Sequence, residues 1–111
     1  MNDLLARVEQ AEGFEWDEGN LPKIWKRHQV RFTECEEVFT GDPRLLLPDP
    51  RHSRIEERFV VHGGSRASRW LGVVFTLRGK LIRVVSARDL NRRERGELQR
   101  GEEAEADSQV P

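Results

Sequence analysis

The segment WLGVVFTL over residues 70–77, the connection Arg78-Gly79 and the segment KLIRVVSA over residues 80–87 decide the fold. The first segment is almost continuously apolar, which is typical of a strand in the middle of a sheet, covered on both sides. The second alternates, which predicts Ile82, Val84 and Ser86 on one face and Leu81, Arg83, Val85 and Ala87 on the other. Arg78-Gly79 offers a tight connection in which glycine accepts a positive φ. These features predict two paired antiparallel strands.

Two further strands are predicted upstream of this pair. Leu45–Leu47 is a short apolar run ended by Pro48-Asp49-Pro50, as expected for a strand followed by a turn. Residues 57–62 alternate, which predicts Phe59 and Val61 on one face and Arg58, Val60 and His62 on the other. We therefore expect His62 at the surface of its strand, and residues 63–68 to form a flexible loop.

The first forty residues are dominated by helical patterns. Residues 1–12 read as a helical or frayed lead-in, and residues 14–16 as a short strand or anchoring segment. Asp17 stands where a helix N-cap belongs, and the apolar stripe behind it predicts a helix that buries one row of side chains: Leu21, Ile24, Trp25 and His28. Pro22 is tolerated because it falls in the first turn.

Two more helices follow from capping signals. Thr33 and Glu36 form a capping box that predicts a second helix with Cys35 in its apolar stripe, ended by Gly41-Asp42-Pro43. Asp89 is expected to cap a last helix that reaches Leu98. The predicted fold class is α+β: two N-terminal helices packed on a small antiparallel sheet, followed by a C-terminal helix.

Length and composition limit the remaining possibilities. The chain of 111 residues suffices for one core, so we expect a single domain over residues 1–100 and an acidic, disordered tail over residues 101–111. No apolar run is long enough to cross a membrane, and the N-terminus lacks the features of a secretion signal. A lone cysteine, Cys35, fits a reducing environment, and we expect a cytoplasmic protein.

The net charge of −1 hides a marked asymmetry. Residues 1–50 hold 6 basic and 11 acidic side chains, residues 51–100 hold 13 and 5, and residues 101–111 hold 4 acidic side chains and no basic one. Most of the basic residues are arginines, whose planar guanidinium pairs with phosphate or carboxylate in bidentate geometry. The cationic second half indicates an anionic partner, nucleic acid or an acidic protein, or else a solubilising surface.

The candidate metal ligands carry no recognisable spacing. His28, His52, His62 and Cys35 form no motif of the kind that binds zinc, and we expect no metal and no cofactor. His28, at the end of an apolar helical stripe, reads as a packing residue. Gly63-Gly64 precedes no lysine–serine pair, so a phosphate-binding loop is not indicated either.

Arginine and histidine residues instead suggest RNA cleavage. The set comprises Arg51-His52, Glu57-Arg58, Arg83, Arg88 and the run Arg92-Arg93-Glu94-Arg95. Cleavage without a metal needs a base for the 2′-hydroxyl proton, cations for the phosphorane charge and an acid for the leaving oxygen. A histidine among arginines has its charged form disfavoured, so His52 is able to accept a proton near neutral pH.

Several blocks resemble the BrnT-type toxins of bacterial type II toxin–antitoxin systems. They are residues 14–20 (FEWDEGN), Lys23, Arg27-His28 with Val30, residues 36–39 (EEVF), residues 48–53 (PDPRHS), residues 56–59 (EERF), residues 82–88 (IRVVSAR) and residues 92–95 (RRER). The blocks keep their order over residues 14–98, and together they are specific. Two departures are Gln29, where the family has a glycine, and the absence of any tyrosine.

The resemblance implies a RelE-like fold and a ribonuclease toxin that blocks translation and arrests growth without a metal or organic cofactor. It also implies a partner, a BrnA-type ribbon-helix-helix antitoxin that forms a 2:2 complex and alone contacts operator DNA. The site residues carried over are Lys23, His52, Arg58 and Arg88, with Glu57, Arg83, Arg92 and Arg95 in second rank.

Roles for these residues are hypotheses. Arg58, Arg88 and Lys23 are expected to hold the scissile phosphate, and His52 or Glu57 to move the proton. Arg83, Arg92 and Arg95 are expected to bind the RNA backbone. The same fold also serves toxins that poison a protein such as DNA gyrase, so a non-nuclease toxin is the alternative.

Overall fold

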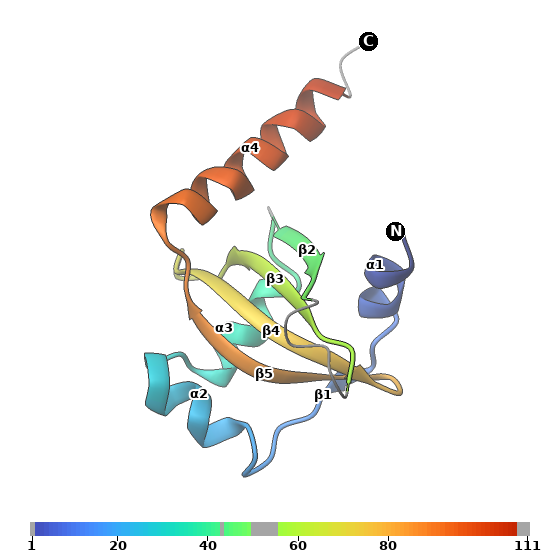
Figure 1. The fold of residues 1–111 in the computed structure, drawn as a ribbon, viewed down its shortest axis with the longest axis vertical. Helices are drawn as coiled ribbons and strands as arrows, with labels where there is room; N and C mark the ends of the chain where they lie inside the picture. The colour runs from blue at the N-terminus through green and yellow to red at the C-terminus, as the bar shows by residue number, and fades with distance from the viewer. Residues whose placement is uncertain (1, 43, 50–55, 109–111) are drawn as a thin grey trace.

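The structure is a computed structural model that describes residues 2–42, 44–49 and 56–108. These residues form one sheet with helices before and after it (Figure 1). In chain order the elements are α1 (Asn2–Glu9), β1 (Gly13–Phe14), α2 (Leu21–His28), α3 (Phe32–Val38), β2 (Arg44–Pro48), β3 (Phe59–Gly64), β4 (Trp70–Arg78), β5 (Leu81–Asp89) and α4 (Arg92–Ser108).

The five strands lie in the order β1-β5-β4-β3-β2. All neighbours are antiparallel except β1, which pairs in parallel with the start of β5. The predicted central strand is therefore confirmed as β4, and the tight connection after it contains Gly79 with a φ of +60°. The α+β class and the mainly antiparallel sheet are confirmed. Three helices rather than two precede β2, because the predicted lead-in forms α1.

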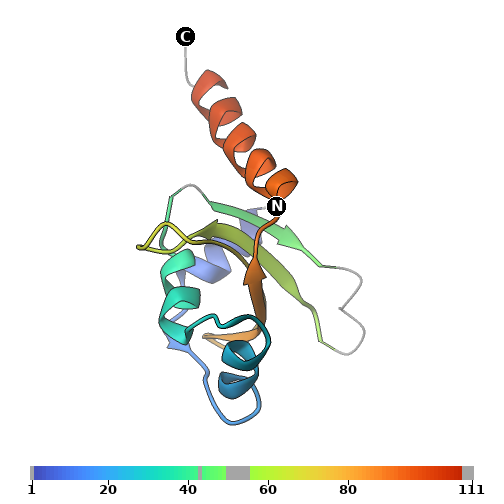
Figure 2. The same ribbon diagram turned by 90° about the vertical axis from the view of Figure 1, so that its left-hand side faces the viewer.

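One face of the sheet carries the hydrophobic core. Phe75 of β4 lies at its centre and packs edge-on against Phe39, with ring centroids 4.9 Å apart. Helix α3 packs on this face, and α2 lies beside the edge formed by β5 (Figure 2). Phe59 and Val61, which are predicted to share one face, are both buried, and so is Cys35, where burial raises the pKa of the thiol to about 12. Cys35 is thus confirmed as a core residue.

Helix α4 starts at the end of β5 and projects from the body of the molecule (Figure 1). Its first half packs on the sheet through Leu98, which is buried. The helix continues to Ser108, and residues 109–111 lie outside the described residues; the division into a domain over residues 1–100 and a tail over residues 101–111 stays a prediction.

The start of α2 differs from the prediction. The residue that precedes the helix is Asn20, not Asp17, and the Asp17 carboxylate accepts the Gly19 N–H within the preceding turn. The expected apolar stripe is also wrong in part, because Ile24 is buried whereas Leu21 and Trp25 are 40% and 51% exposed. The helix has only 8 residues and lies along a sheet edge, so a single row of its side chains is covered.

Two predicted helix caps are displaced in the chain. The capping box of α3 uses Arg31 and Glu34, because the Arg31 N–H bonds to the Glu34 carboxylate at 3.0 Å, and the predicted pair at Thr33 and Glu36 is wrong. At α4 the cap is Asn91, whose side chain accepts the Glu94 N–H at 2.9 Å. The expected cap, Asp89, is instead the last residue of β5.

The predicted alternation of β5 fails after Val84. Val74 of β4 pairs with Ser86, while the next residue, Phe75, pairs with Val84, so Val85 is an extra residue in β5. Such a β-bulge reverses the alternation from that point onward. Ala87 is consequently buried in the core with Ile82 and Val84, and Ser86 turns to the opposite face.

Asn20 is predicted to be a stability determinant of the N-terminal half. Its buried amide donates to the carbonyls of Glu15 and Val84, each at 2.9 Å, and its oxygen accepts the Asp17 N–H at 2.8 Å. Asn20→Ala leaves these groups without that partner, so we expect a loss of about 1–3 kcal/mol in the free energy of unfolding, measured by urea denaturation. Glu18→Ala, in the exposed part of the same turn, is the control, and equal stability of the two variants would contradict the role.

Candidate functional site

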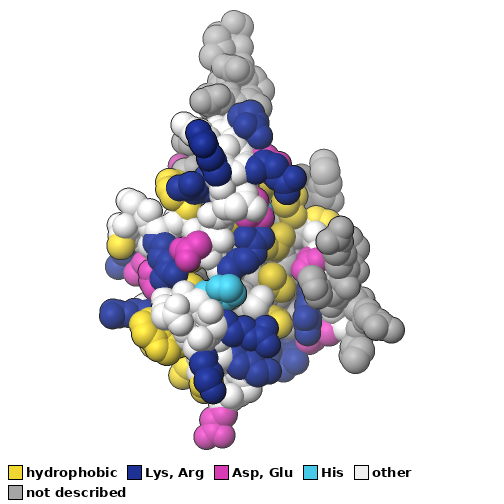
Figure 3. Space-filling view, turned by 60° about the vertical axis from the view of Figure 1, so that its left-hand side comes forward, with side chains coloured by type: hydrophobic (Ala, Val, Ile, Leu, Met, Phe, Trp, Pro, Cys, Tyr) yellow, Lys and Arg dark blue, Asp and Glu magenta, His cyan; other side chains and the backbone are white. Residues whose placement is uncertain are grey.

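A cleft of about 430 Å³ lies between α2 and the face of the sheet opposite the core. Figure 3 shows lysine and arginine side chains gathered in the middle of this side of the molecule and again over the start of α4. Of the described residues that line the cleft, none is acidic. The lining consists of Lys23, Ile24, Arg27 and His28 from α2, Arg58 and Val60 from the region of β3, Gly72 and Val74 from β4, and Val85, Ser86, Ala87 and Arg88 from β5.

The bulge in β5 places Arg88 at this cleft. Residues that face each other across the ladder point to the same side of the sheet, and Gly72 pairs with both His62 and Arg88. Without the extra residue Val85, Arg88 would continue the alternation of Ile82 and Val84 and point into the core. The bulge therefore turns its guanidinium to the same face as Val60 and His62.

Arg58 enters the cleft from the residue before β3. Its backbone is held on both sides, since the Arg58 carbonyl accepts the Asp49 N–H at 2.9 Å and the neighbouring Glu57 carbonyl accepts the Thr76 hydroxyl at 2.7 Å. The side chain is partly buried, and its Nε atom is fully so. Such anchoring fixes the direction in which the guanidinium leaves the sheet.

The cations of α2 reach the cleft because of helical spacing. Ile24 is buried, and Lys23 and Arg27 are four residues apart, so they lie one turn apart on the same side of the helix. The three basic predictions Lys23, Arg58 and Arg88 thus line one cleft, together with Arg27, which the sequence analysis did not single out.

Arg69 holds the end of α2 against the end of β5. The helix stops at His28 because Gln29 adopts a left-handed conformation, with φ 52° and ψ 43°. The carbonyl oxygens of His28 and Gln29 accept hydrogen bonds from Arg69 at 3.0 and 2.8 Å, and the same guanidinium binds the Asp89 carboxylate at 2.7 and 3.0 Å. This pairing raises the pKa of Arg69 and lowers the pKa of Asp89.

Arg88 is paired with Glu94 of α4. Two parallel hydrogen bonds of 2.7 Å join the guanidinium to the carboxylate, and they hold the pKa of Glu94 at about 2. The Arg88 side chain is nevertheless 47% exposed, so guanidinium N–H groups beyond this pair remain at the cleft. The contact fixes the direction of Arg88 and joins the first turn of α4 to the sheet.

His62 lies beneath this pair and corrects another expectation. It was expected at the surface, yet it is only 7% exposed, because the start of α4 covers this end of the open face. Its Nε2 lies 3.9 Å from the Glu94 carboxylate, and burial lowers the pKa of the imidazole. His62 is therefore a neutral, buried residue of the sheet near neutral pH.

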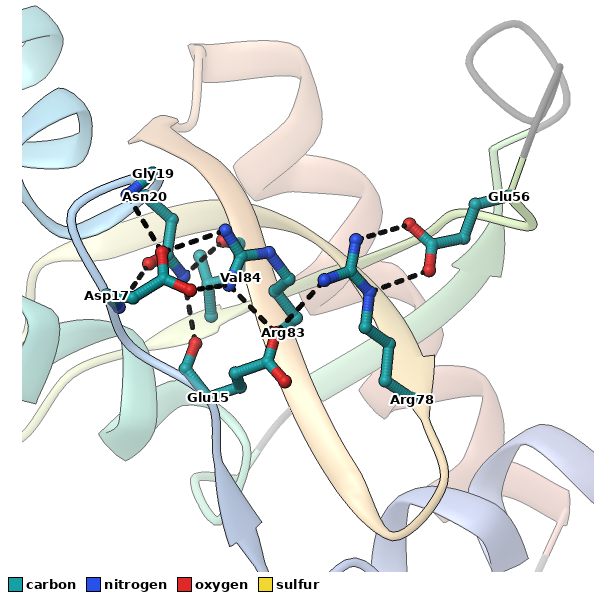
Figure 4. A network of polar contacts seen from close by, with 8 residues as sticks. All are labelled: Glu15, Asp17, Gly19, Asn20, Glu56, Arg78, Arg83 and Val84. Carbon is teal, nitrogen blue, oxygen red and sulfur yellow. Dashed lines mark hydrogen bonds and ion pairs between the residues drawn. The ribbon is translucent and has the colours of Figure 1, made fainter.

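Arg83 lies outside the cleft and belongs to an ion-pair network (Figure 4). Its guanidinium bonds to Glu15 at 2.8 Å and to Asp17 at 2.8 and 3.0 Å, and only 13% of the side chain is exposed. These bonds raise the pKa of Arg83 and lower that of Asp17. Arg78, which binds Glu56 and Glu15, continues the network. Arg83 thus connects β5 to the segment between β1 and α2.

The remaining predicted residues are distributed around the cleft. Glu57 does not line it; its carboxylate is exposed and lies 3.9 Å from Arg7. Arg92 and Arg95 are exposed in the first turns of α4. His52 lies outside the described residues.

No helix within the described residues is long and apolar enough to span a membrane. In the same part of the chain, no group of three or more histidine, cysteine, aspartate or glutamate side chains lies close enough together to hold a metal ion.

Comparison with known proteins gives a match over most of this architecture. The sequence model of a family described as BrnT, the ribonuclease toxin of type II toxin–antitoxin systems, matches residues 16–94. The match spans α2, the cleft and the first residues of α4. No curated protein matches the sequence.

The Glu94 carboxylate is predicted to stabilise the fold in a pH-dependent manner. Its pKa is lowered from 4.5 to about 2, so its contribution is fully present above pH 4.5 and is lost as the pH falls toward 2. We expect Glu94→Gln to cost about 1–2 kcal/mol at pH 7, allowing for the half-exposed partner, and the difference from wild type to close in acid. Urea denaturation between pH 7 and pH 2.5 measures this.

Glu97→Gln is the matched control, because this carboxylate lies on the same helix and is 47% exposed. A stability difference between wild type and Glu94→Gln that stays constant down to pH 2.5 would contradict the role of the ion pair.

Proposed function

The chain belongs to the BrnT family of ribonuclease toxins of type II toxin–antitoxin systems, and we propose that it cleaves RNA in the cleft between α2 and the open face of the sheet. The observation that carries this proposal is that four cations from three separate segments of the chain line this cleft: Lys23, Arg27, Arg58 and Arg88. Since no acidic side chain is among the described lining residues, this surface favours a polyanion.

The proposed reaction is attack by a ribose 2′-oxygen on the adjacent phosphorus. The phosphorane that forms carries additional negative charge, and preorganised cations lower its energy. Arg58 is the central group in this proposal because its backbone is held by two hydrogen bonds and its side chain is partly buried. Arg88 approaches from β5, and Lys23 from α2.

Proton transfer is proposed to involve His52 or Glu57, as the family resemblance suggests. Both precede Arg58 in the chain, and an imidazole or a carboxylate can act as acid or base.

The RNA strand is proposed to continue from the cleft onto the first turns of α4. Arg92 and Arg95 are exposed there and close in sequence to Arg88. Contacts of this kind bind phosphates regardless of sequence, and the affinity they provide falls steeply with salt. Arg83 is now proposed to position β5 rather than to bind RNA, because Glu15 and Asp17 occupy its guanidinium.

The cellular role proposed here is arrest of growth by blocked translation in the cytoplasm. A BrnA-type ribbon-helix-helix antitoxin is the proposed inhibitor, in a 2:2 complex that reaches operator DNA through the antitoxin. The fold is proposed to be RelE-like, in keeping with three helices before β2, a mainly antiparallel sheet and one helix after β5.

The cations of the cleft are predicted to be required for cleavage. Lys23→Gln and Arg58→Gln should each lower the rate of RNA cleavage by the purified protein by on the order of 10²–10³, because each removes charge that stabilises the phosphorane. Arg88 is tested as Arg88→Gln combined with Glu94→Gln, so that no carboxylate is left without its partner.

Matched controls are Lys26→Gln, an exposed residue of α2 outside the cleft lining, and Arg66→Gln, an exposed residue of the β3–β4 loop. Unchanged cleavage by folded Lys23→Gln and Arg58→Gln would refute the assignment of the cleft.

In cells, a pulse of labelled precursors after induction should show protein synthesis stopping first. Prior arrest of DNA synthesis would instead indicate a toxin that poisons a target such as gyrase.

Cleavage is also predicted to be independent of divalent metal. Charge stabilisation in the proposed mechanism comes from guanidinium and ammonium groups, so EDTA should leave the rate within about twofold of that in untreated protein. The measurement is single-turnover cleavage of a labelled RNA with and without the chelator. Loss of activity in EDTA and its return on addition of Mg²⁺ would contradict this part of the mechanism.

A further inference from the structure

The cleft contains a titratable side chain to which the sequence analysis gave only a packing role. His28 lines the cleft with Lys23 and Arg58, and its side chain is exposed. Among side-chain types, histidine is the one whose ordinary titration lies near neutral pH. Of the described cleft-lining residues, His28 alone belongs to this type, so it is the natural proton acceptor on this surface.

The position of His28 relative to the phosphate-binding cations is fixed by Arg69. One guanidinium joins the His28 carbonyl, at 3.0 Å, to the Asp89 carboxylate, at 2.7 Å. Asp89 directly follows Arg88 in the chain. The end of α2 therefore cannot move away from the end of β5 without breaking charge-assisted hydrogen bonds.

The charges around His28 come from every element at the cleft. They are Lys23 and Arg27 from α2, Arg58 before β3, Arg69 before β4, and Arg88 and Asp89 from β5. His28 contributes to the lowered pKa of Asp89, which indicates that this carboxylate is within electrostatic range. The imidazole therefore belongs to a cationic cleft and has one carboxylate within electrostatic range.

We propose that His28 is the general base of RNA cleavage, an inference that rests on the function proposed for the cleft. The imidazole takes the proton of the 2′-hydroxyl as the 2′-oxygen forms its bond to phosphorus and the bond from phosphorus to the 5′-oxygen breaks. The 5′-oxygen takes its proton from a separate acid or from water, and the imidazolium then returns its proton to solvent. The products are a 2′,3′-cyclic phosphate and a 5′-hydroxyl.

The first test is single-turnover cleavage by His28→Ala and by the control Lys26→Gln over a range of pH. We expect His28→Ala to be slower by about 10²–10⁴ with unchanged affinity for RNA, because a base acts on the chemical step. The wild-type rate should rise as the imidazole loses its proton, and this rise should vanish in the variant. Added imidazole should restore part of the activity. Because His28 is exposed, thermal stability should stay close to that of wild type.

A substrate with sulfur in place of the bridging 5′-oxygen separates base from acid. A thiolate leaves without protonation, so this substrate overcomes the loss of an acid but not of a base. We expect His28→Ala to remain slow on it. Recovery of His28→Ala to the wild-type rate on this substrate would make His28 the acid and overturn the proposal. The proposal would also be overturned if His28→Ala cleaved ordinary RNA at the full rate, whether or not it bound RNA more weakly. Full activity of His28→Ala alongside inactive Arg58→Gln would overturn the role of His28 and leave the cleft in place.

Discussion

A single extra residue in β5 determines which side chains can act together in this protein. With Val85 in a bulge, Ile82, Val84 and Ala87 all point into the core, while Arg88 points to the open face. A regular strand would have placed Arg88 opposite Leu71 and sent its guanidinium into the core beside Val73, where an unpaired charge is prohibitively costly. The cationic cleft therefore exists because the pairing register shifts at one position. Bulges are common near functional sites for this reason.

The second constraint is the division of the arginines between carboxylates and the cleft. Arg69 and Arg83 hold separate parts of the chain together: Arg69 joins α2 to the end of β5, and Arg83 joins β5 to the segment after β1. Arg58 is directed into the cleft. Arg88 combines both functions, since Glu94 orients it while half of its side chain stays exposed. The rigid pairs thus support the exposed cations, which is the arrangement that preorganised charge stabilisation requires.

The sequence predicted what depends on local pattern. Apolar runs and turn residues predicted β2 through β5 and the central position of β4, and alternation predicted that Phe59 and Val61 share one face, which the structure shows to be the core face. The predicted helix caps were less accurate, because several polar residues near the start of each helix can act as the N-cap. Tertiary contacts determine which of them does. Asp17 looks like a cap in sequence, yet Arg83, 66 residues away, takes its carboxylate.

The residues of the candidate site, too, could be predicted only where the local sequence identified them. The family blocks pointed to Lys23, Arg58 and Arg88, and these line one cleft. No local signal separated Arg83 from Arg88, since both lie on β5. The carboxylate partner of Arg83 is Glu15, 68 residues away in the chain, and that of Arg88 is Glu94, 6 residues away. His28 was interpreted as a packing residue because its spacing matches Ile24; only the placement of α2 at the sheet edge leaves it in the cleft. The block Arg27-His28 was the one available hint.

The scissile phosphate is proposed to lie among the guanidinium groups of this cleft. The most direct measurement is a nuclear magnetic resonance titration of the arginine side-chain N–H groups with a short RNA whose 2′-hydroxyls are replaced by 2′-O-methyl groups, so that it binds without being cut. Large shifts are expected at Arg58 and Arg88, and little change at Arg78 and Arg83, which are held by carboxylates. Shifts confined to arginines outside the cleft, with Arg58 and Arg88 unmoved at saturation, would contradict this placement.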